Sequence, residues 1–155
     1  MPSLSLPTAR LVALAVPLAL LGGAYIGQYA FGLYPCEMCW WQRYPHFAAI
    51  AFALLAFLRP PGRRFVMLAG AAIAISGLIG GFHAGVEYGW WQGLTACASN
   101  VMAGGDPLDA IMNAPVTRCD VAPWMLLGIS LAGWNFLVSI AAAIVIFTAL
   151  SGDRR

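Results

Sequence analysis

Residues 65–88 read FVMLAGAAIAISGLIGGFHAGVEY, and this stretch decides the fold class. It exceeds the roughly 20 apolar residues that a helix needs to cross the hydrocarbon core of a bilayer. Working outward along the chain, further apolar stretches run over residues 11–33, 44–58 and 123–150. The second of these is long enough only if it starts at residue 36 and holds Arg43 in its outer turns, so we place that span at 36–58.

The composition supports the same class. Of the 155 residues, 61% are hydrophobic and 9% are charged, which is too apolar for a soluble domain. The net charge of +2 includes no basic cluster that would suit a nucleic acid. The first apolar run is longer than the core of a signal peptide, so we keep it as a helix. We therefore predict one all-α integral membrane domain over residues 1–155, built as a four-helix transmembrane bundle.

The arginines predict the orientation of the bundle. Two of them, Arg43 and Arg118, lie toward the side that also holds the four cysteines. The others flank the opposite ends of the spans: Arg10, Arg59, Arg63, Arg64, Arg154 and Arg155. Because an excess of arginine in short loops marks the cytoplasmic face, we expect both termini in the cytoplasm and the cysteines outside it.

The outer loop at residues 89–122 is the longest predicted connection between spans. Within it, Asp106 is a typical N-cap and Pro107 suits the first helical position. Asp109 adds an acid to the first turn, as helix starts prefer. We expect a short interfacial helix at this point, lying on the membrane surface.

A Cys-x-x-Cys motif, Cys36 and Cys39, stands at the start of the second span, directly after Pro35. Proline favours the first position of a helix, so we expect the helix to begin here. A thiol at a helix N-terminus has a lowered pKa, because the helix dipole favours the thiolate. Thiolate is the form that attacks sulfur, so this pair is a candidate for disulfide exchange.

Four further polar residues lie near the same end of the spans. Arg43 and His46 follow the Cys-x-x-Cys on one helix face. Arg43 either stabilises a thiolate, binds an oxygen that becomes negative on reduction, or extends to the lipid headgroups. His83 with Glu87 one turn later either serves a ligand or proton transfer, or contacts a neighbouring helix.

Cys97 and Cys119 bracket most of the outer loop. A structural disulfide would be the ordinary expectation for an exported loop. Two features favour exchange instead. The pair shares a membrane face with the Cys-x-x-Cys, and the intervening segment is rich in Gly, Asp and Asn, which would let the two pairs meet.

These residues resemble the bacterial disulfide bond formation protein B (DsbB) family over nearly the whole chain. The resemblance rests on Cys36, Cys39, Arg43, His83, the Cys97/Cys119 pair and the run WMLLGIS at residues 124–130. It departs from the family in the interior of the Cys-x-x-Cys, Glu37-Met38, where an acid between the thiols would raise their pKa, and in Trp40-Trp41 after it.

The resemblance implies a membrane enzyme of the bacterial inner membrane that reduces ubiquinone or menaquinone. It implies a periplasmic DsbA-like partner with a thioredoxin fold, whose electrons enter at the Cys97–Cys119 disulfide and pass to Cys36 and Cys39. Arg43 and His83 would lie beside the quinone, and we add His46 and Glu87 as candidates. We expect no bound metal.

Three other functions remain open from the residues alone. His46 and His83, on adjacent spans, are a candidate pair of haem ligands in an electron carrier. Cys36, Cys39 and a histidine form a candidate metal site. A membrane scaffold held by two inert disulfides is the third.

Overall fold

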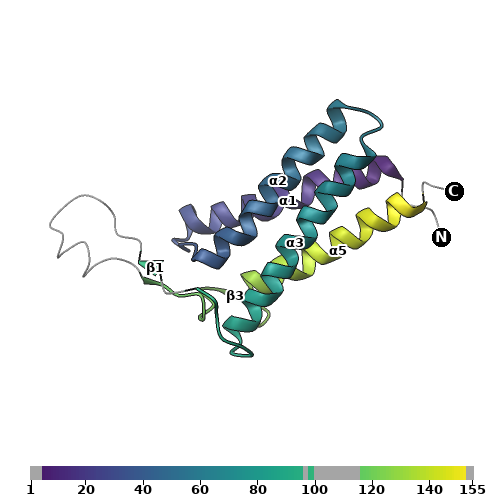
Figure 1. The fold of residues 1–155 in the computed structure, drawn as a ribbon. Helices are drawn as coiled ribbons and strands as arrows, with labels where there is room; N and C mark the ends of the chain where they lie inside the picture. Colours follow the sequence, from purple (N-terminus) through teal and green to yellow (C-terminus); the bar gives the residue numbers. More distant parts are fainter. Residues whose placement is uncertain (1–4, 96–97, 100–115, 153–155) are drawn as a thin grey trace.

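The computed structural model of the protein describes residues 5–95, 98–99 and 116–152. Within these ranges the chain forms four long helices: α1 (Leu6–Ala30), α2 (Glu37–Leu58), α3 (Arg63–Glu87) and α5 (Leu131–Gly152). Figure 1 shows them as one bundle, in which the start of α1, the α2–α3 turn and the end of α5 lie at one end and the short strands at the other. The predicted all-α four-helix bundle is confirmed.

Three of these helices, α1, α3 and α5, are long and apolar enough to cross a membrane. The helix α2 has a comparable 22 residues but is more polar. Its polar side chains Gln42, Arg43 and His46 are all buried in the bundle. Because lipid does not contact these groups, their polarity is compatible with the span that we predicted at 36–58.

Small side chains fill the interior of the bundle. The helix α3 packs against both α2 and α5, and α1 packs against the same two helices. The core residues between them are mostly alanines, among them Ala53, Ala69 and Ala142. Large apolar side chains such as Ile26 and Leu78 are exposed on the outside instead. This arrangement suits lipid, where helices associate through close packing rather than through hydrophobic burial.

Glycines bring α3 and α5 close together. A Cβ placed on Gly77 would lie 3.0 Å from the Ser139 Cβ, and one on Gly81 would lie 2.8 Å from the ring of Phe136. These two glycines therefore lie at a close contact between α3 and α5. Gly23 in α1 differs, since no heavy atom of the described residues lies within 4 Å of a Cβ placed there.

The fourth helix begins later than the predicted residue 123. Strands β3 (Met125–Leu126) and β4 (Ile129–Ser130) form an antiparallel hairpin before it. Both turn residues have positive φ, 54° at Leu127 and 77° at Gly128, which is the two-residue turn that matches strand twist. The Tyr88 hydroxyl holds the hairpin to the end of α3, since it accepts from the Ser130 N–H at 3.0 Å. The outer connection thus extends to Ser130.

A second hairpin lies in that connection. Strand β1 (Ala98–Ser99) pairs antiparallel with β2 (Val116–Thr117), with Ala98 opposite Thr117. The interfacial helix predicted from Asp106, and the side chain of Cys97, lie outside the described residues.

Candidate active site

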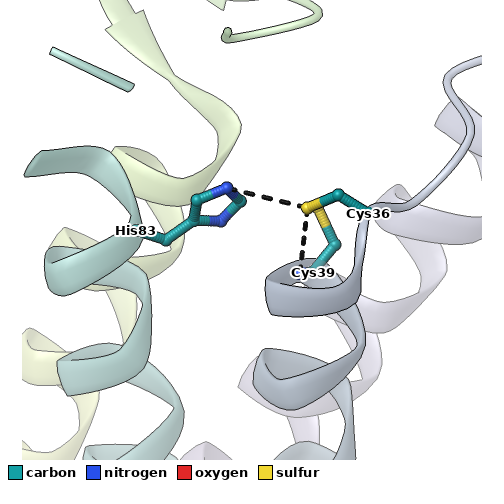
Figure 2. A group of neighbouring side chains, drawn as sticks. All are labelled: Cys36, Cys39 and His83. Atoms are coloured by element: carbon teal, nitrogen blue, oxygen red, sulfur yellow. Dashed lines mark hydrogen bonds between the residues drawn. The ribbon is translucent and has the colours of Figure 1, made fainter. Parts of the chain in front are cut away.

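The Cys-x-x-Cys forms the N-terminal cap of α2. Cys36 is the N-cap residue, and its sulfur accepts a hydrogen bond from the Cys39 backbone N–H at 3.3 Å. The helix therefore starts at Glu37, two residues after the Pro35 that we predicted as its first position. The two Sγ atoms are 2.8 Å apart, while a disulfide requires about 2.05 Å. Figure 2 shows the two sulfurs close together, so a small side-chain movement would bring them to disulfide distance once an oxidant removes two electrons.

The Cys36 and Cys39 thiols are in direct contact. Cys36 is 4% exposed, and its sulfur shares a hydrogen bond with that of Cys39. The lowered thiol pKa that the sequence predicts for this pair, and the opposing effect expected of Glu37, stay predictions.

His83 reaches the cysteine pair from α3, as Figure 2 shows. Its Nε2 lies 3.7 Å from the Cys36 Sγ and 3.8 Å from the Glu87 Oε1. Both side chains, His83 and Glu87, are almost fully buried. The ligand atoms of Cys36, Cys39 and His83 all lie within 4.8 Å of one another, so the three residues also have the spacing of a metal site. The sequence-predicted pair His83 and Glu87 thus does meet the Cys-x-x-Cys.

Cys119 joins the same cluster from the outer connection. It is buried against Cys36, Met38 and Val86, and its side chain interacts with that of Cys36. Burial raises the pKa of the Cys119 thiol, which also accepts a hydrogen bond from the Thr95 hydroxyl at 3.2 Å. All three cysteines in the described residues are free thiols. The expected meeting of loop cysteine and Cys-x-x-Cys is therefore present for Cys119.

A cavity of about 490 Å³ opens beside the thiols. Polar or reactive groups of Cys36, Cys39, His83 and Glu87 lie in its wall. Apolar and small residues of two connections complete the lining, among them Gly32, Leu33, Val121 and Pro123. The volume falls within the roughly 300–1,000 Å³ of ordinary small-molecule sites. The thiol pair is thus accessible to a molecule of moderate size.

Arg43 has different neighbours. Its guanidinium donates to the Gln28 Oε1 at 2.7 Å and lies 4.9 Å from the ring centroids of both Tyr25 and Trp40. Gln28 and Tyr25 belong to α1 and Trp40 to α2. Arg43 is outside the lining of the cavity formed by the described residues. Its assignment to a ligand stays a prediction.

His46 lies deeper in the bundle than the thiols. Its Nε2 is 2.9 Å from the Asn135 Oδ1 of α5. His83 in turn bonds to Gln42, so an Asn135–Gln42 pair separates the two histidines. This arrangement gives no support to haem ligation by His46 and His83.

Sequence reasoning missed Gln42 and Asn135 as site residues. Both are buried, and their amides link α2 and α5 behind His83. A signal for Asn135 was present, because a lone amide in a long apolar span is costly unless it is bonded inside the bundle. The sequence did not distinguish Gln42 as a buried site residue, because it stands beside Arg43 at the polar end of its helix.

Comparison with known proteins places the chain in a family. The family model described as "Disulfide bond formation protein DsbB" matches residues 7–149. A disulfide bond formation protein B of Aromatoleum aromaticum is 35% identical over 90% of this chain and 89% of its own length. One of Paracidovorax citrulli is 31% identical over 86% of this chain and 85% of its own. No solved structure gives a significant match. The chain therefore belongs to the DsbB family, and it is a multi-pass membrane protein of disulfide bond formation.

Proposed function

We propose that this protein oxidises a soluble, thioredoxin-like dithiol protein of the DsbA kind and passes the two electrons to membrane quinone. Electrons enter at the Cys97–Cys119 disulfide, which the donor reduces by thiol–disulfide exchange. The resulting dithiol then reduces the Cys36–Cys39 disulfide. When bound, quinone accepts two electrons and two protons, and the Cys36–Cys39 dithiol becomes a disulfide again.

The position of Cys119 supports this proposal most strongly. A structural staple would need only its own partner cysteine, whereas Cys119 is buried against Cys36. Exchange requires the attacking sulfur to reach one sulfur of the other disulfide directly. The interaction between the Cys119 and Cys36 side chains provides that approach.

The β1–β2 hairpin supports the pairing of Cys97 with Cys119. Ala98, the residue after Cys97, lies opposite Thr117, two residues before Cys119. The register therefore brings together the two chain segments that hold these cysteines.

The cavity supports a quinone as the electron acceptor. A planar carbonyl ring needs a site with apolar walls and a few hydrogen-bond donors, and the cavity combines Leu33 and Val121 with His83. Its lining also includes Cys36 and Cys39, so an acceptor held there would be close to the thiols. We assign His83 and Glu87 to this site. Arg43 would influence it only through α1 or Trp40.

The charge pattern supports an orientation in the bacterial inner membrane with the cysteines in the periplasm. Arg10, Arg59 and Arg63 lie at or next to the bundle end that is opposite to the strands (Figure 1). The cysteine cluster lies at the start of α2 and the end of α3, at the strand end. Arginine marks the cytoplasmic end, so the thiols face outward.

Quinone reduction by the purified protein tests the proposal. With a reduced DsbA-like donor and a short-chain ubiquinone under anaerobic conditions, we expect one quinol for each donor disulfide formed. The absorbance of the quinone follows the reaction, and alkylation of the donor counts its thiols. A donor without cysteines is the matched control and should give no turnover.

Two results would contradict the proposal. One is oxidation of the donor at an unchanged rate when quinone is omitted. The other is a visible haem spectrum in the purified protein, which would favour the electron carrier instead.

A further inference from the structure

A chain of buried amides connects His83 of α3 to α2 and α5. The Gln42 Nε2 lies 2.8 Å from the His83 Nδ1 and 3.2 Å from the Met38 carbonyl oxygen. The Gln42 Oε1 accepts from the Asn135 Nδ2 at 2.9 Å. Asn135 also donates from Nδ2 to the Ser76 carbonyl oxygen at 3.2 Å. Gln42 belongs to α2, Ser76 and His83 to α3, and Asn135 to α5.

The two carbonyl oxygens fix which way each amide points. A backbone carbonyl only accepts hydrogen bonds, so the atom of Asn135 beside Ser76 must be the NH₂ group. That NH₂ group also faces Gln42, which must therefore present its oxygen to Asn135. The NH₂ group of Gln42 is then left for the Met38 carbonyl and for His83. Turning the Gln42 amide would place two acceptors together at Met38 and two donors together at Asn135.

We infer that Gln42 and Asn135 are positioning residues that hold His83 in the tautomer with its proton on Nε2, aimed at the Cys36 sulfur. The Nδ1 atom of His83 accepts from Gln42, so a neutral ring must carry its proton on Nε2. That nitrogen is 3.7 Å from the Cys36 Sγ. Buried networks of this kind fix one arrangement because an unsatisfied amide is costly.

This tautomer makes His83 a hydrogen-bond donor to sulfur instead of a base. In the proposed relay, the bond between Cys36 and another sulfur breaks, and when Cys36 is the leaving group it takes the electron pair as a thiolate. The Nε2–H of His83 then stabilises the negative sulfur. In the same tautomer Nε2 offers no lone pair to a metal, so a metal at Cys36, Cys39 and His83 would require the Gln42 amide to turn. The catalytic consequence rests on the proposed function, whereas the tautomer does not.

Nitrogen NMR on the reduced, full-length protein in detergent micelles tests the inference. The chain has two histidines, so ¹⁵N-histidine labelling gives two rings. We expect the wild-type His83 to show a protonated Nε2 and an unprotonated Nδ1. Gln42→Met and Asn135→Leu should each produce a mixture of the two tautomers. Ser139→Ala is the matched control, because its hydroxyl bonds Asn135 on the oxygen side, at 3.1 Å, and does not touch Gln42.

Turnover links the tautomer to the reaction. The kcat of Gln42→Met should fall in proportion to the remaining Nε2–H fraction, about twofold when the tautomers are equally populated, with an unchanged KM for the donor. A wild-type His83 protonated on Nδ1 overturns the inference, as does a Gln42→Met protein that keeps a single Nε2–H signal. If the tautomer shifts as expected but kcat is unchanged, hydrogen-bond donation by His83 has no role in catalysis. The positioning of His83 by the amides would still stand. Absence of quinone reduction in the wild type would instead refute the proposed function and leave the NMR result intact.

Discussion

Cys36→Ser and Cys39→Ser are each expected to abolish quinone reduction, by about 10³-fold or more, with any reductant. A serine hydroxyl forms no disulfide, so the pair next to the cavity would lose its only means of passing two electrons. Cys97→Ser and Cys119→Ser should abolish oxidation of the DsbA-like donor to the same degree. They should retain quinone reduction by dithiothreitol, since a small thiol reaches the Cys36–Cys39 pair through the cavity without the loop.

Steady-state assays with both reductants separate the two classes of variant. Ser151→Ala is a suitable control, because this hydroxyl bonds the Phe147 carbonyl oxygen in the last turns of α5, at the end of the bundle away from the thiols. Full donor-driven turnover by Cys97→Ser would refute the two-pair relay. Loss of dithiothreitol-driven turnover in Cys119→Ser, with the fold intact, would show that Cys119 acts at the quinone step as well.

Gly80→Leu is expected to lower the free energy of unfolding by about 2–3 kcal/mol, the upper range for an overpacked core. A Cβ on Gly80 would lie 2.9 Å from the Ala132 carbonyl oxygen and 2.9 Å from the Asn135 Nδ2. The first contact is with a backbone oxygen, which cannot move aside by changing a side-chain rotamer. The second is with the amide chain behind His83, so relaxation at this point would disturb that chain as well.

Unfolding of the protein in mixed micelles by increasing dodecyl sulfate measures this effect. Gly23→Leu is the matched control: the same substitution in α1, at a position with no described atom within 4 Å. Leucine is a better helix former than glycine, so Gly23→Leu should be neutral or slightly stabilising. Equal destabilisation by the two substitutions would show that helix–helix distance at Gly80 is not the cause.

The helices could be predicted from the sequence because apolar length alone specifies a span in lipid. Residues 65–88 predicted α3 almost to its ends: the helix also includes Arg63 and Arg64, and Gly89, shortly after its last residue, has a φ of 72°. The apolar run at residues 123–150 predicted α5, but it also concealed the hairpin of β3 and β4 at its start. The run WMLLGIS is almost entirely apolar, and no residue type in it indicates that Leu127 adopts a positive φ.

The residues of the site could be predicted from the sequence, but their surroundings and hydrogen bonds could not. The membrane face shared by the two cysteine pairs predicted the meeting of Cys119 with the Cys-x-x-Cys, and the i, i+4 spacing of His83 and Glu87 placed them together. The burial of Cys36 and its contact with His83 were not predictable, because they depend on how α3 packs against α2. The amide chain depends on which helices face each other, and a single sequence does not specify that for Gln42 and Asn135.

A single turnover without any donor tests the central claim most directly. The fully reduced protein is mixed anaerobically with one equivalent of ubiquinone, quenched in acid, alkylated and mapped by mass spectrometry. We predict one quinol for each protein and a new disulfide between Cys36 and Cys39. Unreduced quinone, with both Cys36 and Cys39 recovered as alkylated thiols, would contradict the account.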